Sequence, residues 1–452
     1  MPRIHPKRDS IEELVAGLGR TNRLLLQHAL GCSACREALL DLLGESAERP
    51  ASLGRVLTWR FTERSYGATV DVALRRLKSR LSSAERERAA APELLQELLH
   101  QPAERRRGMV GEGDRYRSMG LADLLLRECR EANLRQDPAA ADLARLALAV
   151  VSRLDPAVYG KRLLEDLRAR GWAFLANALR IASDLRAADE AFTAAEAHLA
   201  RGTRDRLERA QLLQLKASLR RAQRRFAESE KLYVSSIALF LRAGERHQAG
   251  AAMVSRSTLT SRMGDDEAAF AQLREAADLI DPEADPRLNC YVRHNLIDYL
   301  QRLGRYGEAQ ALMAKSAHFY ELFHEPHLLL RRQWISALIA RGLGRPEEAA
   351  EILRQVCQGF VDLGDGYLSA LASLDLAGVC LLLGCTAEVK RLTEEMVPIF
   401  LSRDVHREML AAVKLFHQAA TAEQATVAMA DELAKILRQG PREALPPSDP
   451  KL

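Results

Sequence analysis

The stretch from residue 296 to residue 315 reads LIDYLQRLGRYGEAQALMAK, with amphipathic helical patterns on both sides of a short turn. Gly304 stands at the turn, where glycine can adopt the left-handed conformation that ends a helix without a steric clash. Ala309 follows five positions later, and its small side chain allows two helices to approach closely. This stretch therefore predicts a helical hairpin.

The same hairpin recurs along the chain with a period of about 40 residues. Alanine, leucine, glutamate and arginine dominate and only 5% of residues are aromatic, a composition that favours helices over sheets. We therefore predict an all-α fold in which hairpins stack and bury their apolar faces against their neighbours. The predicted turns are at Ser183, Arg224, Gly264, Gly304, Gly344 and Gly384, followed by Ala188, Ser229, Ala269, Ala309, Ala349 and Val389.

These hairpins resemble the tetratricopeptide repeat (TPR), whose pattern runs Trp-x2-Leu-Gly-x2-Tyr, Gly-x-Tyr-x2-Ala and Phe-x2-Ala. The resemblance implies a right-handed α-solenoid. Because the usual period is about 34 residues, we expect longer helices here or longer inter-repeat loops, such as Leu279–Asn289. The matching residues are Trp172, Leu175, Ala176, Leu179, Ser183, Leu185, Ala188, Phe192 and Ala195 in one unit, and Leu296, Leu300, Gly304, Tyr306 and Ala309 in another.

The chain is predicted to contain four regions. Residues 1–85 form a small helical module, and residues 86–118 form a connector with one helix. Residues 119–437 form the TPR-like superhelix of about seven helix pairs. The proline-rich residues 438–452 form a disordered tail.

The first region contains a His-x3-Cys-x2-Cys motif at His28, Cys32 and Cys35. On a helix these side chains share one face, and thiolate with imidazole is a ligand set that zinc prefers. A tetrahedral site needs a fourth donor, for which His5 is the candidate. A metal-free redox dithiol and inert buried cysteines remain alternatives, as does a zinc site that oxidation opens.

This motif after a short helix resembles the zinc-binding anti-sigma domain of bacteria. The resemblance implies that His5, His28, Cys32 and Cys35 hold a structural zinc ion and that the module contacts a sigma factor. The chain departs from the commonest family members because a helical array, not a membrane helix, follows the motif.

Other function classes lack support in the sequence. There is no GxxxxGK, HExxH, GxSxG or strand-flanked GxGxxG motif, so we predict no enzyme. No apolar run is long enough to span a membrane, and MPRIHPKRDS is not followed by the apolar region of a secretory signal. Seven cysteines form no disulfide framework, which favours a reducing cytoplasm.

The TPR resemblance also implies which side chains point into the concave face. An amide and a guanidinium, as in Asn295 and Arg302, are the groups by which some TPR proteins clamp a peptide carboxylate. A solvated polar groove without a ligand is the alternative. The implied residues are Asn177, Arg180, Tyr291, His294, Asn295, Asp298, Arg302, Arg331 and Trp334.

We therefore predict a cytoplasmic bacterial regulatory scaffold whose array binds a peptide or protein partner. The alternative is a peptide- or redox-sensing transcriptional regulator that contacts DNA through its basic N-terminal half, for example Arg75–Arg80. A nucleic-acid partner is not expected, because no aromatic residues interleave with these basic ones for base stacking. The net charge of +5 is too small to decide between partners.

Overall fold

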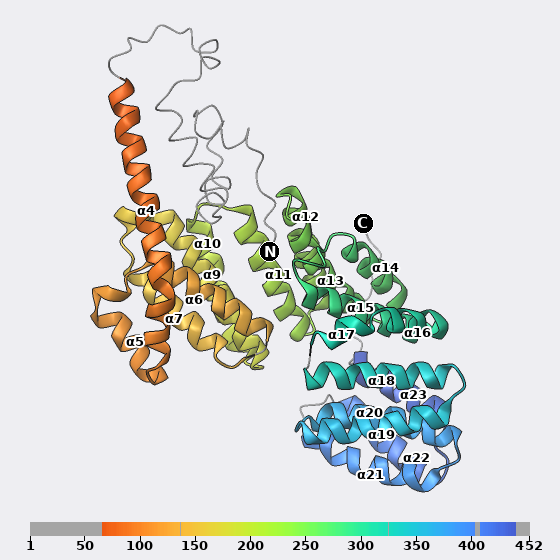
Figure 1. Ribbon diagram of the computed structural model, residues 1–452. Coiled ribbons are helices and arrows are strands. Elements are labelled where there is room, and N and C mark those ends of the chain that lie inside the picture. Colours follow the sequence, from red (N-terminus) through yellow and green to blue (C-terminus); the bar gives the residue numbers. More distant parts are fainter. Residues whose placement is uncertain (1–65, 136, 324, 403–406, 440–452) are drawn as a thin grey trace, which may run out of the picture. The chain divides into compact units, whose positions relative to one another are not determined.

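The structure is a computed structural model that describes residues 66–135, 137–323, 325–402 and 407–439 (Figure 1). Helices and short connections account for these residues, and no strand occurs among them. None of the described helices has the length and apolar character needed to cross a membrane. The predicted all-α architecture is thus confirmed.

The first compact unit of the chain is Met1–Thr203. In the described part of this unit, helix α4 (Tyr66–Leu99) continues without a break through residue 85, the predicted end of the first region. The described helices of this unit are α4 (Tyr66–Leu99), α5 (Ala103–Glu112), the 3-10 turn η2 (Asp114–Tyr116), α6 (Met119–Leu134), α7 (Ala140–Arg153), α8 (Pro156–Tyr159), α9 (Lys161–Ile181) and α10 (Leu185–Arg201).

A close backbone contact joins α4 to α6 in this unit. A Cβ atom on Gly120 would lie 2.5 Å from the carbonyl oxygen of Glu87, so only glycine fits there. The Glu87 carboxylate accepts hydrogen bonds from the amides of Met119 (2.7 Å) and Gly120 (3.3 Å). A carboxylate at a helix N-terminus satisfies free amides and complements the helix dipole, which fixes how α6 packs on α4.

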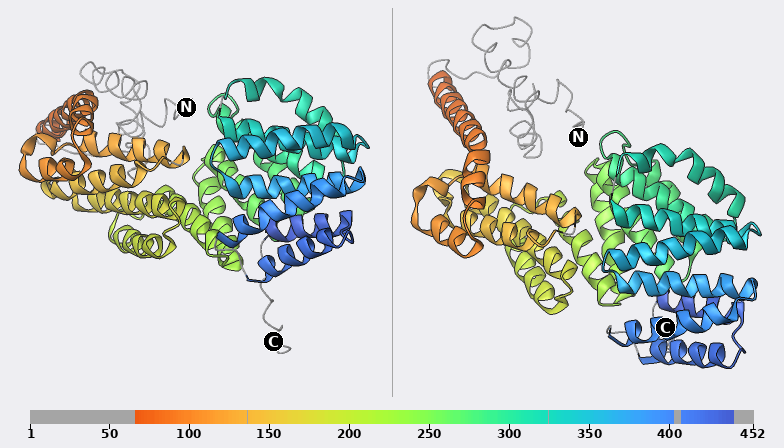
Figure 2. Two further views of the ribbon diagram at one scale, coloured as in Figure 1. Left: turned by 90° about the horizontal axis from the view of Figure 1, so that it is seen from below. Right: turned by 60° about the horizontal axis from the view of Figure 1, so that its bottom comes forward.

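The second compact unit, Arg204–Leu452, contains the regular part of the array (Figure 2). Its first helices, meaning the first of each hairpin, are α11 (Arg206–Ala222), α13 (Arg246–Arg262), α15 (Pro286–Arg302), α18 (Pro326–Gly342), α20 (Gly366–Leu382) and α22 (Arg407–Thr421). Its second helices are α12 (Phe226–Arg242), α14 (Asp266–Ala277), α16 (Tyr306–Lys315), α19 (Pro346–Asp362), α21 (Thr386–Ser402) and α23 (Val427–Gln439), and the short α17 (Ala317–Glu321) follows α16.

Equal helices and equal turns explain the long period. Most helices of this unit have 17 residues, and turns of three residues join them, so two helices and two turns fill one repeat. The helices, not mainly the loops, are therefore longer than in a 34-residue repeat. The loop before Pro286 is longer because α14 ends early, at Ala277.

All six predicted turn residues have positive φ, between 61° at Arg224 and 93° at Gly264. The chain reverses direction through the hydrogen bond of a Schellman turn, such as Arg305 N to Leu300 O at 2.9 Å. Gly244 and Gly364 adopt the same conformation in the turns between hairpins. These two turns are not among those predicted from the sequence.

The small residues that follow the turns are buried where the helices of each hairpin meet. Ala188, Ala269, Ala309 and Ala349 are fully buried, and Val389 is 1% exposed. Ser229 is also fully buried and satisfies its hydroxyl by donating to the carbonyl of Ala217 at 2.8 Å. Each hairpin therefore closes on a small side chain, as the sequence predicts.

Candidate functional site

Most of the predicted binding residues lie on the first helices of the second unit, and Arg302 of α15 forms an ion-paired network there. Its Nη2 lies 2.7 Å from Oδ2 of Asp298, and Nη1 lies 3.8 Å from Oδ1 of Asp266. Nη1 also donates to the Ser261 hydroxyl at 3.2 Å. Burial opposes the charged form, but the two carboxylates raise the pKa of Arg302. A ligand carboxylate would have to compete with Asp298 and Asp266 for this guanidinium.

His294, one turn before Asp298, is a packing residue. It is 8% exposed, its Nδ1 lies 3.1 Å from the Tyr320 hydroxyl, and the two rings meet edge to face. Burial lowers the pKa of His294 to about 4, while Asp298 opposes and Arg331 adds to the shift. The imidazole is therefore neutral near pH 7 and supplies no positive charge to a ligand.

Three predicted residues remain accessible on the neighbouring helices α15 and α18. Asn295 is half-buried and Arg331 is exposed, and neither has a hydrogen-bond or ion-pair partner among the described residues. Tyr291 is 36% exposed and its hydroxyl donates to Glu325 at 3.4 Å. An amide and a guanidinium without partners on adjacent helices are suited to an incoming peptide backbone or carboxylate.

Trp334 of α18 is part of a buried contact with the last described helix, α23. Its Nε1 donates to Oδ2 of Asp375 in α20 at 2.7 Å. Arg438 of α23 pairs with the same carboxylate and lies over the indole, 5.6 Å from the ring centroid. Nearer the start of α23, Asp431 accepts two hydrogen bonds of 2.8 Å from Arg341 of α18.

The apolar stripe of α23 completes this contact. Ala430, Leu433, Ala434 and Leu437 are all buried, and α23 lies beside α20 (Figure 1). The first helices thus accommodate an amphipathic helix through an apolar centre and flanking ion pairs. The sequence does not predict this packing, although a lone carboxylate, Asp375, in the otherwise apolar α20 is a signal that a cation must approach it.

Asn177 and Arg180 belong to the other unit and take part in an internal network. Nδ2 of Asn177 donates to Oδ1 of Asn133 at 3.2 Å, and its Oδ1 accepts from Nε of Arg180 at 3.0 Å. Asn133 in turn donates to the carbonyl of Phe174. Asn177 is 8% exposed, so its amide holds helices α6 and α9 together.

The predicted zinc ligands His5, His28, Cys32 and Cys35 lie outside the described residues. Within the residues that the structure does describe, no group of three or more His, Cys, Asp or Glu side chains could hold a metal ion. The zinc site therefore stays a prediction from the motif.

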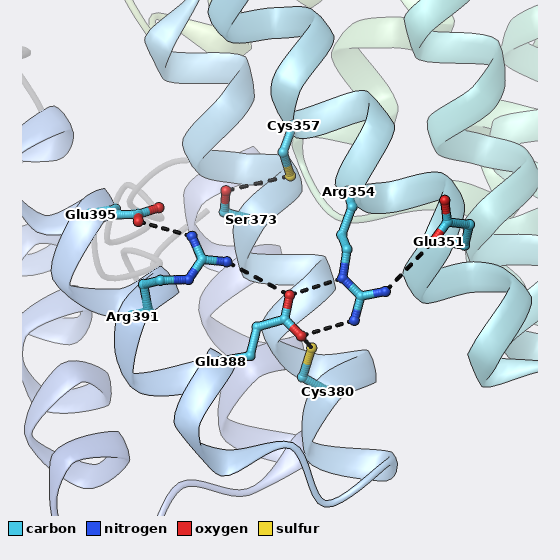
Figure 3. A network of polar contacts seen from close by, with 8 residues as sticks. All are labelled: Glu351, Arg354, Cys357, Ser373, Cys380, Glu388, Arg391 and Glu395. Atoms are coloured by element: carbon cyan, nitrogen blue, oxygen red, sulfur yellow. Dashed lines mark hydrogen bonds and ion pairs between the residues drawn. The ribbon is translucent and has the colours of Figure 1, made fainter.

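Two cysteines, Cys357 of α19 and Cys380 of α20, lie beside a polar network (Figure 3). Arg354 binds the Glu388 carboxylate through two hydrogen bonds of 2.9 and 2.8 Å, and Sγ of Cys380 lies 3.4 Å from the same carboxylate. Burial, and then the charge of Glu388, raise the pKa of Cys380 to about 12. Burial raises the pKa of Cys357 to about 11, and a hydrogen bond donated by Ser373 partly opposes this rise. Both thiols are thus protonated and weakly nucleophilic.

Comparison with known proteins relates the chain to others through its fold. No protein-family model matches the sequence, and no curated protein does. The structure matches that of a Rap protein complexed with competence and sporulation factor, with 11% identity over 70% of this chain and 87% of that chain and a TM-score of 0.53. It also matches aspartyl phosphate phosphatase F from Bacillus subtilis, with 9% identity over 99% and 100% of the chains and a TM-score of 0.44. The chain thus shares an all-α, TPR-like repeat fold with the Rap protein.

Proposed function

We propose that this protein is a regulatory scaffold whose second unit binds a protein or peptide partner on the face formed by its first helices. The observation that carries the proposal is how α23 lies against first helices: its apolar stripe packs on α20, and ion pairs join it to Asp375 of α20 and Arg341 of α18. A surface that accommodates one amphipathic helix has the chemistry to bind another segment. The accessible amide of Asn295 and guanidinium of Arg331 mark the part of this face that offers unused polar groups.

The matched Rap protein supports the same class of function, because that protein is described in complex with competence and sporulation factor. Repeat arrays of stacked hairpins generally bind through extended faces rather than enclosed pockets. We therefore propose binding, not catalysis, as the role of this unit.

Site-specific photocrosslinking tests the binding face. A photoreactive amino acid replaces Asn295 or Arg331 in the full chain, expressed in its native host, and Gln355 serves as the control. Gln355 is exposed on the second helix α19 and thus on the opposite member of a hairpin. We expect a discrete cross-linked species from the first two positions and none from the control. Equal cross-linking at all three positions, or none at any, contradicts the proposal.

For the N-terminal motif we propose a structural zinc site formed by His5, His28, Cys32 and Cys35, in a module that contacts a second protein. The support is the ligand chemistry of the motif and its resemblance to anti-sigma domains. Metal analysis of the purified full chain should give about one zinc per chain. The double variant Cys32→Ser, Cys35→Ser should lose it, and Cys385→Ser, a matched exposed thiol, should keep it. Metal-free wild-type protein would refute the site.

The identity of the second protein rests on the resemblance alone, which suggests a sigma factor. Co-purification of the full chain with sigma factors of its host tests this suggestion. The Cys32→Ser, Cys35→Ser variant should lose the interaction if the zinc module makes the contact. Co-purification that survives in the variant would assign the contact to the array instead.

A further inference from the structure

Three arginines gather where two first helices of the second unit end. Arg221 lies in the last turn of α11, Arg224 in the turn that follows, and Arg262 is the last residue of α13. Nη1 of Arg221 reaches the carbonyl of Ser255 in α13 at 3.5 Å, which ties the two helices together at this point. We call Arg221, Arg224 and Arg262 the arginine cluster.

The cluster is not neutralised by carboxylates in the part of the chain that the structure describes. Among the described residues, no aspartate or glutamate forms an ion pair or hydrogen bond with any of the three guanidiniums. Arg224 and Arg262 are exposed to solvent, and Arg221 is half-buried. By contrast, Arg302 and Arg341 of the same unit are ion-paired.

The repeat provides an internal comparison for Arg262. Arg302 stands at the equivalent position of the next repeat, where Asp298 and Asp266 neutralise it. The positions equivalent to these two carboxylates carry Thr258 and Phe226 around Arg262. The Thr258 hydroxyl donates to a carbonyl of its own helix and is not turned to Arg262 as a substitute. The repeat thus keeps the arginine at this position and lacks both of its anions.

The surroundings of Arg262 are positive and aromatic. Partial desolvation by neighbouring protein atoms lowers the pKa of its guanidinium, and the charges of Arg221 and Arg224 lower that pKa further. The other groups that act on it are the phenols of Tyr367 and Tyr233, which oppose the shift. The Tyr233 hydroxyl already contacts Ser218 at 3.0 Å. Three like charges beside weak dipoles form a site that an anion would stabilise.

We propose that the arginine cluster binds the side-chain carboxylates of an acidic peptide segment in the partner of this unit. Guanidinium groups pair with carboxylates through two parallel hydrogen bonds, and three of them at adjacent helix ends suit closely spaced Asp or Glu residues. A nucleic-acid backbone would require a longer stripe of unpaired basic residues than this compact cluster. The inference rests on the proposed binding function and specifies the charge of the ligand.

Fluorescence anisotropy of the full chain with a labelled oligoglutamate peptide tests this inference. An oligoglutamine peptide of equal length and a single-stranded DNA oligonucleotide are the comparison probes. Arg262→Gln is the test variant and Arg242→Gln the matched control, because Arg242 is also exposed in a last helical turn and has no partner among the described residues. We expect Arg262→Gln to weaken oligoglutamate binding about tenfold or more and the control to leave it unchanged.

Thermal melting shows that the test variant is folded. Removing one of three like charges relieves repulsion, so Arg262→Gln should melt no lower than wild type. Equal oligoglutamate binding by wild type and Arg262→Gln, an equal loss in Arg242→Gln, or binding of DNA in preference to oligoglutamate each overturns the inference. Photocrosslinking from Asn295 separates it from the proposed function. If Arg262→Gln keeps both the cross-links and the oligoglutamate binding, the proposed binding face stands and the acidic ligand is refuted.

Discussion

Acidification is expected to destabilise the second unit through one buried histidine, His294. Its pKa is held at about 4 by burial, against 6.5 for the free side chain. A group whose folded pKa is depressed stabilises the fold above its unfolded pKa, and this contribution is lost as the pH falls through the folded pKa. The stabilisation should thus be complete above about pH 6.5 and disappear progressively towards pH 4.

The magnitude follows from the same two values. Their separation corresponds to about 3 kcal/mol when the pH is well below 4, and between pH 7 and pH 5 the loss should be about 2 kcal/mol.

Urea unfolding at pH 7 and at pH 5 measures this loss, with Trp334 as a local reporter. Trp334 lies in the next hairpin, and replacing Trp59 and Trp172 by Phe removes the other indoles. His294→Gln is the comparison protein. It retains every other histidine, so the titration of those histidines cancels when the pH dependence of the variant is subtracted from that of the wild type. The wild-type chain should lose about 2 kcal/mol more than the variant between the two pH values. Parallel pH dependence in the two proteins would refute the reasoning.

Three further predictions concern single contacts. Asp375→Asn removes the charge that holds Arg438 and should loosen α23, costing about 3 kcal/mol, with faster amide hydrogen exchange in α23 as the measurement. Gly120→Ala places a methyl group 2.5 Å from the Glu87 carbonyl and should lower the unfolding free energy by about 1–3 kcal/mol in thermal unfolding. Ser183→Gly relieves a φ of 65° and should raise the unfolding free energy by about 1 kcal/mol, measured as a higher melting temperature. An unchanged melting temperature would contradict the turn geometry.

The hairpins could be predicted from the sequence because their signals are local. A turn residue and a small residue five positions later lie within one hairpin, and the structure gives Ser183 and Arg224 the left-handed conformation even without glycine. The alignment with glycines at equivalent positions marks both turns. Packing of Ala309 against its neighbour follows from the same short pattern.

The candidate site was less predictable because it depends on contacts between distant residues. The TPR resemblance predicted that Asn295 and Arg302 share one face of a helix. It did not predict the ion pair between Arg302 of α15 and Asp266 of α14, the second helix of the preceding hairpin. The ion pair of Arg341 with Asp431 links positions about 90 residues apart, and no local period contains that information. The lone Asp375 in an apolar helix shows only that a partner is needed, not which one.

Repetition itself supplies the missing information about charge. Equivalent positions in successive hairpins share a backbone environment, so a difference in their ion pairing reflects the side chains alone. At this position Arg302 is neutralised by carboxylates of the protein itself. Arg262 lacks them, so an external anion would take their place. Introducing one of the two missing carboxylates should therefore move Arg262 towards the neutralised state. Thr258→Asp should pair with Arg262, raise thermal stability and reduce oligoglutamate binding, whereas Thr258→Asn, which adds no charge, should do neither.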